Sequence, residues 1–202
     1  MAHRLVRRLL RWPRFRVVAL LLGAGLGMAG CFQLREPEPA TVASEWIQPT
    51  QVDILLNNFT TAVRTLNVAN YERCFRAPGY RFVPDPTSAG SSQAIFANWS
   101  VPEETTYFTS LRRRTAPGSS NSLLLTDRRD NPYSIDSVEV SALYQLRINQ
   151  RDTAFRASLL QGSLRLVLVR RRDNEWKIKE WRDQRTGTGA CWTDLKRYFF
   201  TH

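Results

Sequence analysis

The sequence predicts an α+β domain in which N-terminal helices pack on the concave face of a strongly bent antiparallel sheet. Three observations predict it. Residues 49–66 carry apolar side chains at helical spacing, whereas residues 137–149 alternate between apolar and polar as a half-buried strand does. Asp173 and Asn174 then form a turn between two further strands. Because long antiparallel strands twist, this sheet should curl around the helices that precede it.

The first half of the domain is expected to be mainly helical. The apolar face of the first helix consists of Val52, Leu55, Leu56, Phe59, Val63 and Leu66. Thr50 and Asp53 resemble a capping box at its start, and a second short helix spans residues 71–75. A strand over residues 80–83 and a loop to residue 98 follow. Pro102 then opens a third helix, which has arginines near its end.

The second half is expected to be β-structure. Residues 123–125 form a short strand, and residues 137–149, 153–169 and 175–181 form three long antiparallel strands. Gly162 interrupts the second long strand, so we expect a β-bulge there that bends the sheet.

The charge of the chain argues against a nucleic-acid partner. The formal net charge is +11, from 29 Lys and Arg against 18 Asp and Glu. Six arginines lie within the first 16 residues, ahead of any acidic residue. Without these six, 23 basic residues face 18 acidic ones, and a net charge of +5 is ordinary for a protein surface.

The N-terminal segment has the layout of a secretion signal. An arginine-rich stretch precedes an apolar run of 13 residues, Val17 to Ala29, whereas a membrane-spanning helix needs about 20. The sequence Met28-Ala29-Gly30-Cys31 resembles the lipobox of bacterial lipoproteins, in which the cysteine is acylated. The alternative is an ordinary signal peptide followed by a chance cysteine. We expect residues 1–30 to be the signal, residues 31–48 a tether after the lipidated Cys31, and residues 49–202 the folded domain.

The residue after the lipobox bears on the location. Phe32 is not the aspartate that retains many proteobacterial lipoproteins at the inner membrane, so the resemblance favours the outer membrane. The expected location is the bacterial cell envelope, with the protein attached to the membrane through Cys31.

The order of elements resembles the nuclear transport factor two-like superfamily over roughly residues 49–198. The segments that carry the resemblance are Phe82-Val83-Pro84-Asp85-Pro86, Trp99-Ser100-Val101-Pro102-Glu103-Glu104, Trp176-Lys177-Ile178-Lys179-Glu180-Trp181-Arg182-Asp183 and Cys191-Trp192-Thr193-Asp194-Leu195-Lys196. More narrowly, the chain is similar to uncharacterised bacterial lipoproteins of that fold. The resemblance implies a cystatin-like α+β cone with a pocket between sheet and helices. The superfamily contains enzymes such as ketosteroid isomerase and scytalone dehydratase as well as non-catalytic binding domains, so the fold does not decide the function.

Histidine is nearly absent, which removes several kinds of catalysis. His3 lies in the signal segment and His202 is the last residue of the sequence, so nucleophilic triads and histidine-built zinc sites lack their central residue. The sequence has no glycine-rich phosphate loop, and we expect neither cofactor nor metal. Carboxylate acid/base chemistry remains, as the resemblance to isomerases and dehydratases implies.

Asp85 is the best single candidate for that catalytic chemistry. It ends the strand over residues 80–83, between two prolines that would fix its backbone. A rigid exposed turn gives the same Pro-Asp-Pro pattern, so both roles stay open. Asp183 lies on the same strand face as Trp181, and an ion pair with an arginine is the favoured role for it.

Aromatic side chains are candidates for the lining of the pocket. They are Phe82, Trp99, Tyr107, Tyr144 and Trp181. The alternative is that most of them form the core, since large aromatic residues usually pack. Once Cys31 is acylated, Cys74 and Cys191 remain as an even pair in an oxidising compartment, which leaves a disulfide and two free thiols both open.

These observations favour a membrane-anchored extracytoplasmic lipoprotein that acts as a ligand-binding or protein-interaction module. Its partner would be the membrane, through Cys31, together with an unknown small molecule or protein. The alternative is a pocket enzyme of isomerase or dehydratase type that uses a carboxylate as its acid/base group.

Overall fold

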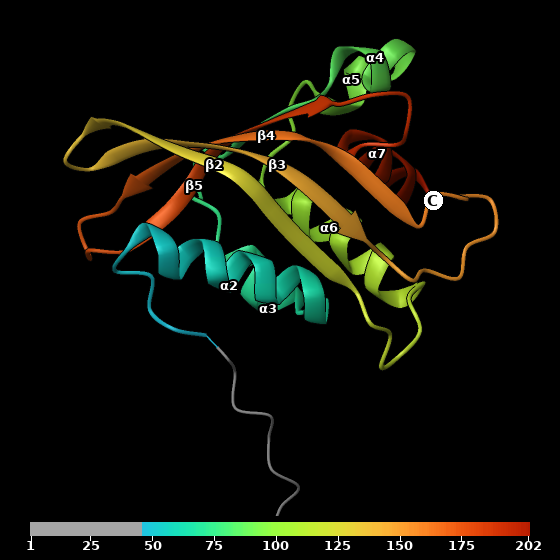
Figure 1. Ribbon diagram of the computed structural model, residues 1–202, viewed down its shortest axis with the longest axis horizontal. Coiled ribbons are helices and arrows are strands. Elements are labelled where there is room, and N and C mark those ends of the chain that lie inside the picture. Colours follow the sequence, from blue (N-terminus) through green and yellow to red (C-terminus); the bar gives the residue numbers. More distant parts are fainter. Residues whose placement is uncertain (1–45) are drawn as a thin grey trace, which may run out of the picture. The chain divides into compact units, whose positions relative to one another are not determined.

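A five-stranded sheet forms the centre of the part of the chain that the structure describes, residues 46–202 of the computed structural model (Figure 1). The strands are β1 (Arg81–Val83), β2 (Ser122–Ser134), β3 (Ser137–Arg147), β4 (Leu159–Arg170) and β5 (Trp176–Arg185). Their order in the sheet is β1-β5-β4-β3-β2. Only the short β1 runs parallel to its neighbour, β5, and the other described pairs are antiparallel. The expected α+β fold class is confirmed.

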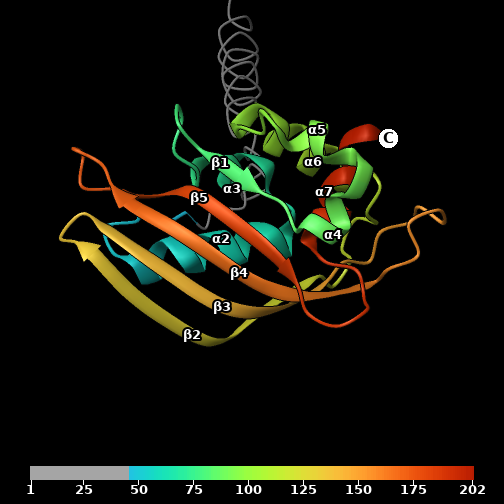
Figure 2. The same cartoon turned by 90° about the horizontal axis from the view of Figure 1, so that it is seen from above.

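Helices cover one face of this sheet (Figure 2). They are α2 (Val52–Thr65), α3 (Val68–Arg73), α4 (Pro86–Ala89), α5 (Gln93–Phe96), α6 (Val101–Arg113) and α7 (Trp192–Thr201), with a 3₁₀ turn at Gly90–Ser92. Helices α2 and α7 both contact β5, and α6 packs on α7. Since apolar side chains alternate along β3 and β4, their inward set meets these helices and forms the core.

Local sequence explains where the two helices nearest the core begin. At the start of α6 the Glu103 carboxylate accepts a hydrogen bond of 2.9 Å from the backbone N–H of Ser100, and Pro102 lies in the first turn. At the start of α7 the Asp194 carboxylate accepts one of 2.9 Å from the N–H of Cys191. The capping box expected at Thr50 is wrong, because α2 begins after Gln51 and no side chain caps it.

Several elements differ from the sequence-based expectation. The loop expected before residue 98 contains α4 and α5, and the expected short strand over residues 123–125 is the beginning of the longer β2. Helix α7 was not expected at all. The turn at Asp173 and Asn174 is confirmed, and Asn174 has a positive φ of 65°.

The bulge expected at Gly162 is wrong. Gly162 pairs in register with Tyr144 on β3 and Arg185 on β5, and the irregularity of β4 lies between Val167 and Leu168. A Cβ at position 162 would lie 2.6 Å from the Tyr144 hydroxyl and 2.7 Å from the backbone oxygen of Gln184. The glycine is needed because the Tyr144 side chain crosses over it.

The signal segment, Cys31 and the tether up to residue 45 lie outside the described residues. Within residues 46–202, no helix is both long and apolar enough to cross a membrane.

Candidate functional site

The aromatic residues predicted to line a pocket do come together between sheet and helices. Phe82 lies 5.6 Å from Trp181 and 6.0 Å from Trp99, measured between ring centroids, and Trp99 lies 6.1 Å from Tyr107. The Tyr144 ring contacts the ring of Trp192 on α7, and the Trp192 ring contacts that of Trp181. All five predicted residues expose 2% or less of their surface. A cavity large enough for a ligand would leave surface accessible on its lining, so these rings pack against one another instead of facing an open pocket.

An ion pair lies at the centre of this interior. The Lys196 ammonium on α7 contacts the Glu104 carboxylate on α6, and both side chains are completely buried. The same carboxylate accepts hydrogen bonds of 2.9 Å from the Trp99 indole N–H and from the Tyr71 hydroxyl, and a further one from Tyr80. These donors satisfy both oxygens of the carboxylate, which a buried charge requires.

Aromatic rings surround the ammonium of this pair. The Lys196 Nζ atom lies 3.6 Å from the centroid of the Phe82 ring and 3.8 Å from that of Trp181. Such cation–π contacts partly replace lost hydration. Burial lowers the pKa of Lys196 to about 8, although the Glu104 carboxylate acts in the opposite direction.

A second polar group adjoins the ion pair and is centred on Asp183. Its carboxylate accepts a hydrogen bond of 2.8 Å from the Tyr144 hydroxyl and two of 2.7 Å from Thr193, one from the backbone N–H and one from the hydroxyl. Burial raises the pKa of Asp183, while these hydrogen bonds lower it. The arginine ion pair favoured for Asp183 from the sequence is wrong, since among residues 46–202 its carboxylate is bound by hydroxyl and N–H groups and by no arginine.

The Asp85 carboxylate accepts hydrogen bonds that join α4 to β5. One oxygen accepts a 2.7 Å hydrogen bond from the Ser88 N–H, which caps α4, and the other accepts a 3.1 Å bond from the Arg185 N–H. Burial alone would raise the pKa of Asp85, but these hydrogen bonds hold it below the ordinary value. Asp85 is thus buried and acts as a helix cap joined to β5.

The two cysteines of the domain are free thiols. Cys74 follows α3, and its thiol donates to the backbone oxygen of Asn70. Cys191 precedes α7 and lies 3.0 Å from the Ser88 hydroxyl. Of the two possibilities that the sequence left open, a disulfide or two free thiols, the structure has the free thiols.

Sequence reasoning missed the central residues of the interior: Tyr71 as a hydrogen-bond donor, Glu104 and Lys196. In the sequence, Glu104 stood out only as part of a segment that carries the family resemblance. Lys196 lies on a face with Trp192, Leu195 and Phe199, a helical spacing that could have revealed α7.

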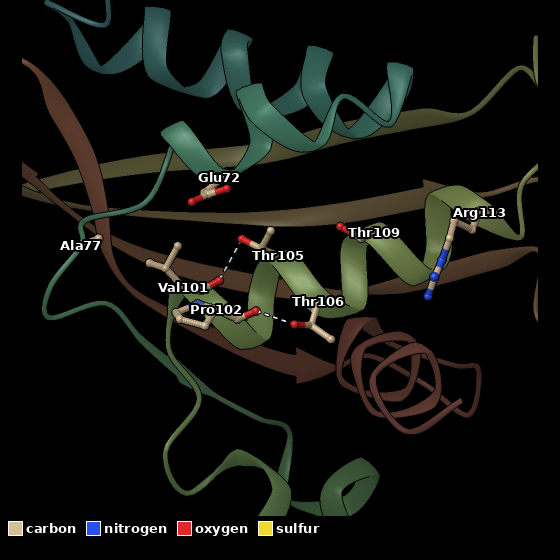
Figure 3. Close-up of a pocket in the computed structure, with 8 residues that line it drawn as sticks. All are labelled: Glu72, Ala77, Val101, Pro102, Thr105, Thr106, Thr109 and Arg113. Carbon is tan, nitrogen blue, oxygen red and sulfur yellow. Dashed lines mark hydrogen bonds between the residues drawn. The ribbon is translucent and has the colours of Figure 1, made fainter.

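Two hollows on the surface of the described domain contain none of the residues predicted to line the pocket. The first is a groove of about 580 Å³ beside α6 (Figure 3), lined by Glu72, Ala77, Val101, Pro102, Thr105, Thr106, Thr109 and Arg113. Its hydroxyls at Thr105 and Thr106 donate to the backbone oxygens of Val101 and Pro102 at 3.0 and 2.8 Å. The second, of about 620 Å³, is formed by the end of α2 and residues 115–121, with Arg64 and Arg112. No cluster of metal-binding side chains occurs in the described part of the chain.

No protein-family model and no curated protein matches this sequence. Solved structures do resemble it. A candidate aromatic ring hydroxylase from Novosphingobium aromaticivorans is 16% identical over 72% of this chain and 93% of its own, with a TM-score of 0.54. A candidate scytalone dehydratase from the same organism is 11% identical over 69% and 89%, also with a TM-score of 0.54. A protein of unknown function from Mycobacterium tuberculosis is 13% identical over 74% and 84%, with a TM-score of 0.51.

At such low identity these similarities concern the fold alone. Together with the order of strands and helices, they show that the chain shares the α+β fold of these structures, in which helices pack on one face of an antiparallel sheet, as the sequence predicted.

Proposed function

We propose that the protein is a bacterial lipoprotein of the cell envelope whose domain is a non-catalytic binding module. Acyl chains on Cys31 would attach it to a membrane, with the outer membrane favoured by Phe32. The support for attachment is the order of basic stretch, apolar run, small residues and cysteine in residues 1–31.

The buried pair of Glu104 and Lys196 carries the proposal of a non-catalytic module. An enzyme of this fold needs space for substrate beside its acid/base groups. Here the carboxylate and the ammonium neutralise each other, and the rings of Phe82 and Trp181 pack on the ammonium. The interior is thereby used for stability, and partners would bind at the surface.

The groove beside α6 is a surface at which a partner could bind. Figure 3 shows Glu72 across the groove from Thr105, and Arg113 farther along the same helix. Neither charged side chain has an ion-pair partner among residues 46–202. A partner with complementary charges could therefore pair with both without breaking contacts in the domain.

One observation favours the alternative of a pocket enzyme. The indole N–H of Trp181 is buried without a hydrogen-bond partner. The Trp181 ring contacts the ammonium of Lys196, and the pKa of Lys196 is lowered. Groups with shifted pKa values and unsatisfied donors are frequent in active sites. This alternative requires α7 to move away from the sheet and open a space for substrate.

Membrane attachment is tested by expressing the full chain with a C-terminal tag in a bacterium and fractionating the cells. The wild type should appear in the membrane fraction, resist extraction by salt and yield an intact mass for acylated residues 31–202. Cys31→Ser should give a soluble or an uncleaved product. Cys74→Ala is the matched control and should remain in the membrane. A cleaved Cys31→Ser product that still needs detergent for extraction would contradict lipid attachment.

A further inference from the structure

Two exposed apolar side chains lie at the turn between β2 and β3. Ile135 exposes 82% of its surface and Tyr133 61%, more than any other large hydrophobic residue in the described chain. Tyr133 donates a 2.6 Å hydrogen bond to Glu139, which leaves its ring at the surface. These two apolar side chains lie close together in the sequence at one turn and are mostly outside the core, so both are available for a contact outside the domain.

The turn between β4 and β5 lies beside this first turn (Figure 1). The Arg170 guanidinium donates to the Asp136 carboxylate at 2.7 Å and to the backbone oxygen of Ile135 at 3.3 Å. Arg171 pairs with Asp173 at 3.4 Å, whereas Arg172 is exposed. The two turns, residues 133–136 and 170–175, therefore form one end of the sheet, which we name the hairpin end.

The chain enters the domain at this same end. The backbone N–H of Trp176, which follows the second turn, donates a 2.8 Å hydrogen bond to the backbone oxygen of Pro49. The Arg170 guanidinium lies 5.9 Å from the Trp176 ring. Cys31 precedes Trp46 by 15 positions, so the chain between them can span at most about 50 Å.

We infer that the hairpin end docks on the lipid bilayer to which Cys31 is attached. The inference rests on the proposed lipid attachment, which would hold the domain within about 50 Å of the membrane and raise its local concentration there. Tyrosine prefers the membrane–water interface, isoleucine the acyl region, and an arginine such as Arg172 can extend to the head groups. Since Arg170 and Arg171 are already paired, insertion of Ile135 is the main contact, and docking should depend little on salt.

The test uses a fluorophore placed on a single cysteine. Cys74 and Cys191 have no exposed surface, so a thiol-reactive, environment-sensitive dye should label only Ile135→Cys in the folded, acylated protein. The matched control is Ser120→Cys, just before the other end of β2. Each labelled protein is incorporated through its acyl chains into vesicles of phosphatidylethanolamine and phosphatidylglycerol, with or without brominated acyl chains.

Dye at position 135 should shift to shorter wavelength and be quenched by the brominated lipid, while dye at position 120 should show neither change. A Tyr133→Cys protein should behave like Ile135→Cys. Co-flotation of protein and vesicles reports the lipid attachment separately, and its loss would overturn that proposal. Co-flotation without quenching at positions 133 and 135 would overturn only the docking, and would leave the hairpin end as a surface for a protein.

Discussion

Lys196 on α7 and Glu104 on α6 form an ion pair that has no exposed surface and is enclosed by aromatic rings. The residues are 92 positions apart in the sequence. The pair fixes α7 against α6, because moving either helix would leave a buried charge without its partner. It occupies the region in which the sequence resemblance implied a pocket.

Removing one member of this pair should be costly. Glu104→Gln preserves the shape but leaves the buried ammonium of Lys196 without a carboxylate, so the free energy of unfolding should fall by about 3–5 kcal/mol. The exposed carboxylate of Asp53 offers a control, and Asp53→Asn should cost less than about 1 kcal/mol.

Urea denaturation of Glu104→Gln, Lys196→Met and the double variant measures the coupling between the two residues. The double variant should lose less stability than the sum of the single variants. Additive losses would show that the pair does not act as a unit.

The stability of the protein should increase with pH between about 8 and about 9. The folded-state pKa of Lys196 is about 8, below its ordinary value of 10.5, so between these values the unfolded chain holds a proton that the folded chain has released. The contribution of Lys196 to stability therefore rises with pH through that window. Above about pH 9 the total stability should fall, because burial raises the pKa values of two thiols and three hydroxyls, so the unfolded chain ionises first; these groups are Cys74, Cys191, Tyr71, Tyr80 and Tyr107. Urea midpoints measured from pH 7 to pH 11 should show the rise in the wild type only, and an equal rise in Lys196→Met would refute its assignment to Lys196.

Asp85 should behave as a helix cap. Asp85→Ala removes the acceptor for the N–H groups of Ser88 and Arg185 and should cost about 1–2 kcal/mol, whereas Asp85→Asn keeps one acceptor and should cost less. The folded-state pKa is below the ordinary 3.8, so the contribution of this carboxylate is present above pH 3.8 and is lost as the pH falls through the folded-state value. Denaturation at pH 7 and pH 3 checks both statements. Equal stabilities of wild type and Asp85→Ala at pH 7 would contradict the capping role.

Gly162 should not tolerate a methyl group. The Cβ of Gly162→Ala would lie 2.6 Å from the Tyr144 hydroxyl and 2.7 Å from the backbone of Gln184, so we expect a loss of about 1–3 kcal/mol. Gly189→Ala is the matched control, since no atom lies within 4 Å of its added Cβ. Thermal unfolding of the two variants should differ clearly, and similar midpoints would show that β3 and β4 can separate at Tyr144.

The sequence predicted those parts of the fold whose pattern is local. The strand at residues 137–149 was evident because apolar residues occur at every second position, and the first helix because they occur at helical spacing. The charged residues 127–130 concealed the outer half of β2, an edge strand whose side chains are exposed there. The four-residue helices α4 and α5 are too short for periodicity to show.

The candidate site was only partly predictable for a related reason. The five aromatic residues were found because large rings on the inner faces of strands and helices usually meet. The roles of Glu104 and Lys196 were not predicted, because the pairing of two charges that are distant in the sequence depends on tertiary structure. Helix α7 begins at a cysteine, which is not a usual capping residue, and its buried face includes a lysine. Without α7, the sequence suggested an open cone where the fold has a packed interior.

Chemical modification of lysine tests most directly whether the interior is closed. The chain has three lysines, Lys177, Lys179 and Lys196, so an amine-reactive acetylating reagent followed by mass spectrometry resolves each one. In the folded protein at pH 9, above the lowered pKa of Lys196, exposed Lys179 should react fully while Lys196 remains unmodified until urea unfolds the chain. Modification of Lys196 in the folded protein at a rate close to that of Lys179 would contradict a packed interior and would favour an accessible pocket with a reactive amine.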